Sequence, residues 1–122
     1  MKIFDTNIWI AAYIPSDSTH NLAKDILEKY DDTIYLTQGI VAEIITVLKN
    51  KKHLAGAKRF VKMVYNNADF VILSNDKYYQ DTIDYFLSSN DTKLSFVDMS
   101  LVVLSQKYQI ETFDKALKAA IN

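Results

Sequence analysis

Four acidic residues spread over the chain are the side chains best suited to chemistry: Asp5, Glu43, Asp98 and Asp114. A coarse reading of the hydrophobic pattern places each of them at or just beyond the C-terminal end of a strand. In an open parallel sheet, those ends border the crevice in which ligands bind, so residues distant in sequence can meet there. We therefore predict that the four carboxylates share one crevice.

Such a cluster needs compensating positive charge, because two carboxylates about 4 Å apart repel by ~4 kcal/mol at an effective dielectric near 20. Mg²⁺ and Mn²⁺ prefer carboxylate and water oxygens. The chain has no cysteine, and His20 and His53 lack a metal-binding spacing, so no softer metal is favoured. Acid-only sites of this kind best support hydrolysis of phosphodiesters, since a bound ion activates the attacking water and holds the phosphate. We predict one or two Mg²⁺ or Mn²⁺ ions and no side-chain nucleophile.

Three of the acids also have a purely structural explanation. Asp5 and Asp114 can each cap the helix that follows, and Ser95 with Asp98 resembles a capping box before an apolar run. Glu43 differs, because no lysine or arginine stands at i+3 or i+4 to give it a helical ion pair. The capping alternative therefore stays open for Asp5, Asp98 and Asp114.

The elements that must position these acids follow from periodicity. Strands are predicted over residues 1–4, 33–37, 70–73 and 109–113, and helices over 8–14, 22–30, 40–48, 53–67, 75–87, 97–108 and 115–121. Strands separated by helices pair in parallel through right-handed crossovers. The prediction is an α/β fold with a mainly parallel, helix-flanked sheet of four strands, or five if one follows Asp114. At 122 residues, the chain is expected to form a single domain over 1–122.

Charge is distributed unevenly around a formal net value of −1. Residues 44–68 contain six cations and no acid, whereas residues 69–98 contain six aspartates and two lysines. The basic stretch is either a solvated helical hairpin or a phosphate-facing patch. The patch would comprise Lys49, Lys51, Lys52, Lys58 and Arg59.

No segment of the sequence indicates a membrane or an export pathway. The apolar run at residues 8–14 is too short to span a bilayer, and we find no targeting segment. The absence of cysteine fits a reducing compartment. We expect a cytoplasmic protein.

These residues resemble the PIN-domain nucleases, and more narrowly the VapC-like toxins of toxin–antitoxin pairs. The resemblance spans nearly the whole chain and rests on four elements in order: Ile3-Phe4-Asp5-Thr6-Asn7, Glu43 after the second strand, Leu94-Ser95-Phe96-Val97-Asp98, and Thr112-Phe113-Asp114. It implies the PIN fold and an endoribonuclease dependent on Mg²⁺ or Mn²⁺.

The resemblance also implies roles and partners. Asp5 and Asp98 would be direct metal ligands, and Glu43 and Asp114 would be ligands or would orient the attacking water. The hydroxyls of Thr6 and Thr112 would hold a carboxylate or water in place, unless they serve only as capping and strand residues. RNA would be the substrate, with its backbone on the basic stretch, an antitoxin the partner, and a homodimer the assembly. Only eight residues follow Asp114 (122 − 114), which leaves little room for the final strand that many family members carry.

Two other functions compete with this one. A catalytically silent PIN fold could bind RNA or protein, although the presence of all four acids argues against it. A phosphoacceptor receiver domain would share the length and the α/β architecture. It would need an aspartate at the end of the third strand, where Asp76 comes too late, and a lysine after a final strand, where none fits.

Overall fold

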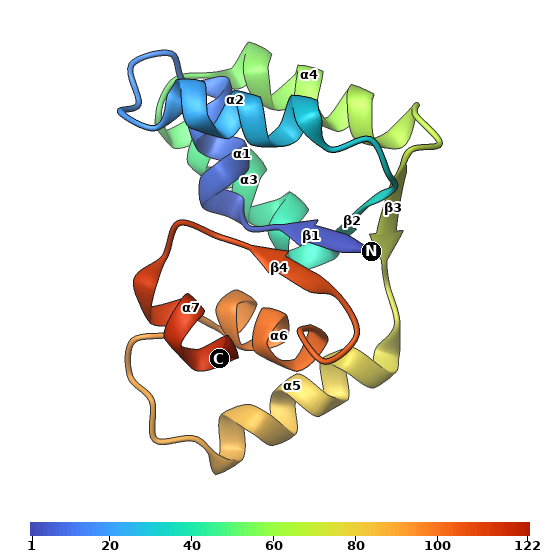
Figure 1. Ribbon diagram of the computed structural model, residues 1–122, viewed down its shortest axis with the longest axis vertical. Coiled ribbons are helices and arrows are strands. Elements are labelled where there is room, and N and C mark those ends of the chain that lie inside the picture. The colour runs from blue at the N-terminus through green and yellow to red at the C-terminus, as the bar shows by residue number, and fades with distance from the viewer.

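The computed structural model describes residues 1–122 as a sheet of four parallel strands with helices between them (Figure 1). The strands are β1 (Lys2–Phe4), β2 (Ile34–Thr37), β3 (Phe70–Leu73) and β4 (Gln109–Glu111). The helices are α1 (Thr6–Tyr13), α2 (His20–Lys29), α3 (Gln38–Asn50), α4 (Leu54–Tyr65), α5 (Asp76–Ser88), α6 (Phe96–Leu104) and α7 (Lys115–Ile121).

The strand order is β3-β2-β1-β4, so β1 lies in the interior of the sheet. Ile3 is paired with Tyr35 on one side and with Ile110 on the other, both in parallel. From β1 the chain adds β2 and then β3 on one side, and returns to place β4 on the other. The topological switch point therefore lies between β1 and β4, and the residues that follow these strands border the crevice where ligands bind in such sheets.

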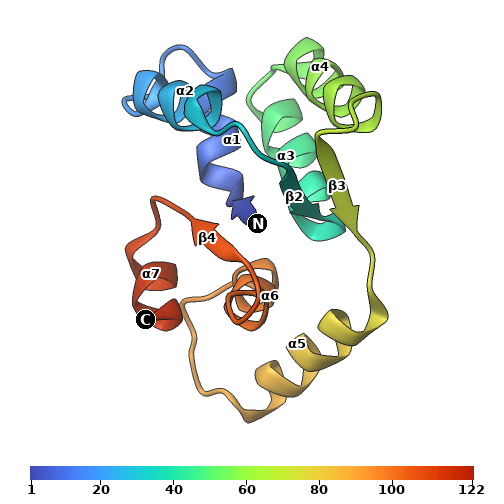
Figure 2. The ribbon, with the colours of Figure 1, turned by 45° about the vertical axis from the view of Figure 1, so that its right-hand side comes forward.

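Helices cover the sheet in two groups (Figures 1 and 2). The first group, α1 to α4, lies at one end of the molecule, and α5 to α7 lie at the other, with the strands between them. Trp9 of α1 is buried in the core, where its ring meets Phe60 of α4 at a centroid distance of 5.3 Å. Edge-on aromatic packing of this kind stabilises the contact beyond its buried area. It anchors α1, which begins directly after Asp5.

The predicted fold class is confirmed, with two differences. The helix predicted over 97–108 ends at Leu104, whose carbonyl accepts from the amides of Lys107 and Tyr108 in a tight turn. The buried Tyr108 ring then packs on Tyr35, at a centroid distance of 5.1 Å, and leads into β4. No fifth strand follows Asp114, because the remaining residues form α7. None of the helices is both long and apolar enough to cross a membrane.

Candidate active site

One pocket of about 380 Å³ brings the four predicted acids together. Its walls come from the start of α1, one face of α3, and the first turns of α6 and α7. It is lined by Asp5, Thr6, Asn7, Ile10, Asp17, Glu43, Val47, Ser95, Asp98 and Asp114. Because no lysine, arginine or histidine lines it, the pocket is strongly anionic.

Two of the acids reach this pocket from within helices and not from the ends of strands. Asp5 follows β1 directly and Asp114 lies three residues beyond β4 (114 − 111). Glu43, however, lies in the second turn of α3, and Asp98 lies in the first turn of α6, which follows a helix and a loop and not a strand. The prediction that each acid stands at a strand end was therefore wrong for Glu43 and Asp98, which are carried into the pocket by the helices themselves.

Asp5 is the most buried of the four, with 4% of its surface exposed. Its Oδ1 accepts from the Thr6 amide at 2.7 Å, and its Oδ2 accepts from the Thr112 hydroxyl at 2.7 Å. Burial, with a smaller contribution from the negative charges of Asp98 and Glu43, raises the pKa of Asp5 from 3.8 to about 6 despite these two bonds. The carboxylates of Asp98 and Glu43 are thus close enough to oppose the ionisation of Asp5.

The Thr112 hydroxyl is the centre of a polar network that joins β1 to β4. Besides donating to Asp5, it accepts from Asn7 Nδ2 at 3.2 Å and from the Asp114 amide at 3.0 Å. A hydroxyl has one hydrogen and two lone pairs, so these bonds fix its hydrogen on Asp5. Asn7 is itself held, because its Oδ1 accepts from the Phe113 amide at 3.3 Å.

The sequence analysis named Asn7 only as part of the motif Ile3-Phe4-Asp5-Thr6-Asn7 and did not predict this role. The segments Asp5-Thr6-Asn7 and Thr112-Phe113-Asp114 both follow short strands, and this was the available signal. It could be used only if β1 and β4 were known to be neighbours, which no local pattern reveals.

Asp98 and Asp114 cap helices and line the pocket at the same time. Oδ2 of Asp98 accepts from the Ser95 amide at 3.0 Å, and Ser95 Oγ accepts from the Asp98 amide at 3.0 Å, which completes a capping box. Oδ1 of Asp114 accepts from the Ala116 amide at 2.8 Å. In both residues the other carboxylate oxygen has no protein donor. The capping alternative is therefore compatible with a role in the pocket.

Glu43 is half-buried and makes no hydrogen bond or ion pair with any side chain or amide of the chain. A carboxylate left in this state retains all its capacity to accept from water or to bind a cation. Its position facing Asp5 and Asp98 makes it the acid whose placement is least explained by local structure.

The donor set of the pocket fits a hard divalent cation. As the side chains stand, no three of them are close enough together to enclose one ion. The pocket volume corresponds to roughly a dozen water molecules at about 30 Å³ each, so carboxylates can reach an ion through its water shell, as Mg²⁺ favours. Thr6 Oγ1 is buried without any hydrogen-bond partner, although Thr6 lines the pocket. Residues and space together fit Mg²⁺ or Mn²⁺.

A fifth acid, Asp17, also lines the pocket and was not predicted. Its Oδ1 accepts from the amide of Thr19 at 2.8 Å and from its hydroxyl at 2.7 Å. These bonds, helped by the positive charges of Lys51 and His20, lower the pKa of Asp17. Asp17 is therefore an anion at the pocket that is already locally satisfied. The hydrogen bonds to Thr19 give Asp17 a structural role in its own turn. Nothing in the sequence indicated that Asp17 lies near the other acids.

The structure separates the five cations of the predicted phosphate-facing patch. Lys51 lies near Asp17, and it continues the face of α3 that carries Glu43 and Val47 at intervals of four residues. Lys58 instead lines a different, apolar pocket beside Leu54.

The other three cations of that patch show no link to the acidic pocket. Arg59 lies beside Tyr13, whereas Lys49 and Lys52 are exposed and make no ion pair. Of the five cations, only Lys51 lies near a residue that lines the acidic pocket, Asp17, although it does not line the pocket itself.

Comparisons with known proteins identify the family and the fold. A family model described as PIN domain matches residues 2–121. Among solved structures, VapC20 of Mycobacterium tuberculosis, described as a sarcin–ricin loop cleaving toxin, has a similar fold with a TM-score of 0.87. The two chains share 17% sequence identity over 98% of this chain and 95% of VapC20, so the similarity is one of fold. Among curated protein sequences, none matches this chain significantly.

Proposed function

This chain belongs to the PIN domain family, and on that premise we propose that it is a metal-dependent endoribonuclease, the toxin of a toxin–antitoxin pair. One observation carries the proposal: four carboxylates from four distant segments of the chain line a single pocket that contains no cationic side chain. VapC20, which has the same fold, is described as a toxin that cleaves the sarcin–ricin loop, and this supports RNA as the substrate class. Membership of this family excludes the receiver-domain alternative.

The residues of the pocket would have different roles in the reaction. Asp5 and Asp98 would hold Mg²⁺ or Mn²⁺ directly, and Asp114 would hold it directly or through water. When bound, the ion supplies a lowered pKa for the attacking water and a counter-charge for the phosphate. Glu43, with no protein partner, would accept a hydrogen bond from that water and orient it. Thr112 would keep the Asp5 carboxylate in place through its 2.7 Å bond.

Partners and location form part of the same proposal. Lys51, beside the pocket, would contact an RNA phosphate. An antitoxin would inhibit by placing a basic side chain among the five acids, where opposite charges favour it. The match over residues 2–121 supports a single PIN domain, and an RNA substrate would place the protein in the cytoplasm.

The test is cleavage of fluorescently labelled RNA by the purified protein with Mn²⁺, with and without EDTA. Wild type should cleave only when Mn²⁺ is not chelated by EDTA. Asp98→Asn should be inactive, while its circular dichroism spectrum should be the same as that of wild type. Asp69→Asn, at an exposed acid outside the pocket, is the matched control and should keep full activity. Cleavage that survives EDTA, or survives in Asp98→Asn, would contradict the proposal.

The separation of the acids favours one second candidate, a PIN domain that binds RNA or protein without catalysis. It predicts RNA binding that Mn²⁺ does not change, with no cleavage of any RNA offered. The same assay therefore distinguishes the two functions.

A further inference from the structure

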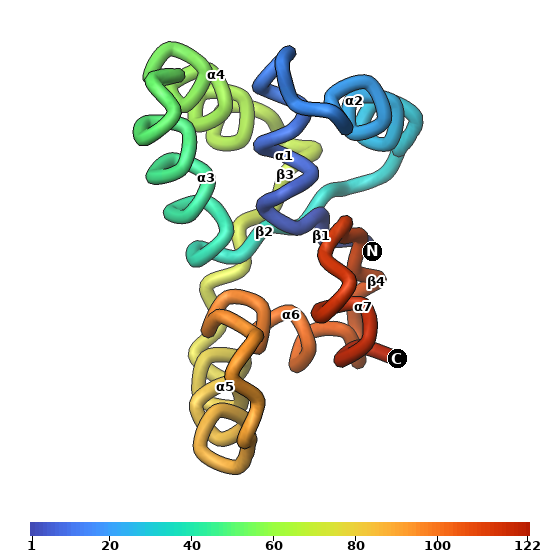
Figure 3. The backbone as a smooth tube through the Cα atoms, turned by 90° about the vertical axis from the view of Figure 1, so that its left-hand side faces the viewer, coloured from blue at the N-terminus to red at the C-terminus, as the bar shows by residue number.

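The acidic pocket continues beyond its four predicted acids, along a groove between α1 and α3. Figures 2 and 3 show these two helices side by side, both running away from the ends of β1 and β2. Thr6 and Ile10 line the pocket from successive turns of α1, and Glu43 and Val47 line it from successive turns of α3. One turn beyond the acids, the walls of the groove are therefore apolar, with Ile10 on one side and Val47 on the other.

Two opposite charges stand at the far end of this groove. Asp17 lines the pocket from the turn between α1 and α2, and Lys51, at the end of α3, lies near it. Eight residues of α3 separate Glu43 from Lys51 (51 − 43), which corresponds to about 12 Å at a rise of about 1.5 Å per residue. Asp17 therefore belongs to a part of the pocket that is separate from the four predicted acids.

The turn holds Asp17 in place through one carboxylate oxygen and leaves the other free. Oδ1 accepts from the amide and the hydroxyl of Thr19, and the Asp17 amide donates to the Ile14 carbonyl at 3.0 Å. The start of α2 is fixed as well, because the His20 amide donates to the Asp17 carbonyl at 3.0 Å and His20 Nδ1 donates to the Ala11 carbonyl at 2.8 Å. Oδ2 of Asp17 accepts no hydrogen bond from the chain and makes no ion pair. Both of its lone pairs are therefore available to a ligand.

The charge of Asp17 restricts the bases that it can recognise. The hydrogen bonds from Thr19, with smaller contributions from Lys51 and His20, lower its pKa, so Asp17 is ionised at neutral pH and can only accept hydrogen bonds. Among the four RNA bases, guanine alone presents two neighbouring donors, N1–H and N2–H, on its Watson–Crick edge. Adenine and cytosine have an acceptor nitrogen beside their amino group, and uracil has its one N–H between two carbonyl oxygens. The free oxygen of Asp17 therefore fits guanine best.

Resting on the proposed nuclease function, we propose that Asp17 determines the base specificity of cleavage, because its Oδ2 binds the Watson–Crick edge of an unpaired guanine next to the scissile phosphate. The base packs against Ile10 and Val47, with the scissile phosphate at the four acids and their ion. Lys51 contacts a neighbouring phosphate of the same strand. Proteins that recognise RNA by sequence typically bind unstacked bases in this way, on the edges that pairing would otherwise occupy. The groove thus has a surface for the base, an acceptor for its edge and a cation for the backbone.

The test compares guanosine with inosine, which differs only by the absence of the N2 amino group. A randomised RNA pool is first cleaved by wild type with Mn²⁺, and sequencing of the product ends should show guanosine enriched at one position beside the cut. Two RNAs, with guanosine or inosine at that position, are then compared by kcat/KM. Wild type should prefer guanosine by about 10-fold or more, as expected for one hydrogen bond to a charged group. Cleavage without any enrichment of guanosine would overturn the inference and leave the proposed function intact.

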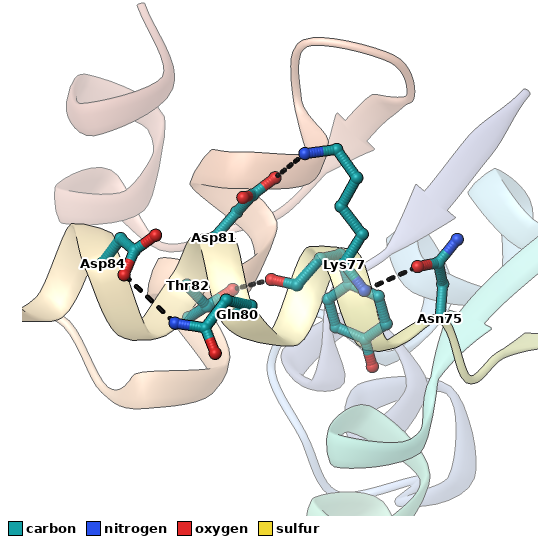
Figure 4. A network of polar contacts seen from close by, with 7 residues as sticks. Asn75, Lys77, Gln80, Asp81, Thr82 and Asp84 are labelled. Atoms are coloured by element: carbon teal, nitrogen blue, oxygen red, sulfur yellow. Dashed lines mark hydrogen bonds and ion pairs between the residues drawn. The ribbon is translucent and has the colours of Figure 1, made fainter.

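In Asp17→Asn, the ratio of kcat/KM for guanosine to that for inosine should fall close to one. The variant can keep the bonds from Thr19 through its amide oxygen, but it replaces the free acceptor with an NH₂ donor. The control is Asp84→Asn on α5, at the other end of the molecule, where the carboxylate accepts only from Gln80 at 3.1 Å (Figure 4). It should keep the wild-type ratio. If Asp17→Asn also keeps that ratio, even while cleaving both RNAs more slowly, Asp17 acts through its turn or the ion and the inference is wrong.

A binding measurement separates this inference from the proposed function. Guanosine 5′-monophosphate contains no phosphodiester, so its binding in the presence of Mg²⁺ can be followed by amide NMR whether or not the protein cleaves RNA. It should shift the amide signals of Ile10, Asp17 and Val47 in wild type, and inosine 5′-monophosphate should bind about 10-fold more weakly. Asp17→Asn should bind the two nucleotides equally. If wild type cleaves no RNA, the proposed function fails and these titrations decide the inference, which equal binding of the two nucleotides by wild type would overturn.

Discussion

The hydroxyl of Thr112 donates a 2.7 Å hydrogen bond to Oδ2 of Asp5, across 107 positions of sequence. The register of β1 on β4 sets this contact: Phe4 is opposite Glu111, and the Asp5 amide donates to the Glu111 carbonyl at 2.8 Å. The residue that follows β4 is then Thr112. The direction of one carboxylate of the pocket is therefore fixed by strand pairing and not by a flexible loop.

Replacing Thr112 with valine should weaken both metal binding and cleavage. The change keeps the side-chain shape but removes the donor to Asp5 and the acceptor used by Asn7 and the Asp114 amide. Removing a supporting hydrogen bond of this kind typically costs about 10- to 100-fold in metal affinity or activity. Mn²⁺ titration by electron paramagnetic resonance and kcat/KM on RNA measure the two effects. Thr112→Ser should keep most of both, and a valine variant equal to wild type would show that the bond has no functional role.

Neutralising Lys51 should reduce the salt dependence of RNA binding, whereas neutralising Lys58 should not. Lys51 lies beside the acidic pocket, and Lys58 lines a separate, apolar pocket with Leu54 and Val61. When a protein binds one phosphate fewer on a single strand, the slope of log K against log salt falls by about 0.7. The slopes can be measured by fluorescence anisotropy in an Asp98→Asn background without metal. Equal slopes for Lys51→Ala and wild type would remove Lys51 from the RNA-binding surface.

Lys52→Gly should stabilise the fold. Lys52 has φ = 63° and ends α3 in the left-handed conformation, where the amide of His53 returns to the Leu48 carbonyl. A side chain in this conformation costs roughly 1 kcal/mol relative to glycine. Urea unfolding should therefore show a gain of about that size for Lys52→Gly, while Lys52→Ala, which keeps the Cβ atom, should show none. A gain shared by both variants would point to the removed charge instead.

The sequence predicted those parts of the structure that depend on local patterns of apolar and polar residues. The four strands are short runs of β-branched and aromatic residues, and the helices have regular apolar spacing, so both were found within a few residues. The end of α6 was missed because it depends on Tyr108 packing against Tyr35 from a distant strand. The division of the basic stretch between two faces depends on how α3 and α4 are rotated in the fold, which composition does not encode.

The residues of the pocket could likewise be predicted only in part from the sequence. The four predicted acids lie around it, and their catalytic and metal-binding roles stay predictions. Asp17 was missed because its turn with Thr19 accounts for its side chain, and Asn7 was missed because its hydrogen-bond partners, Thr112 and Phe113, lie more than 100 residues away in the sequence. Their second role arises only when the order of the strands places distant segments side by side.

The stability of the metal-free protein should depend on pH through Asp5. Because its pKa is about 6 in the folded state, against 3.8 without burial, the folded protein holds a proton that the unfolded chain releases between these values. Stability from this group is therefore present below about pH 4 and lost as pH rises to 6, by about 3 kcal/mol for a pKa difference of roughly two. Asp5→Asn cannot lose this stability, because its amide does not ionise. Urea unfolding in EDTA should therefore show that the free energy of unfolding of the variant rises relative to that of wild type, by about this amount, between pH 4 and pH 7. Adding Mn²⁺ at pH 7 should restore the stability of wild type but leave that of the variant unchanged. A difference in stability between the two proteins that does not change with pH would show that Asp5 ionises normally.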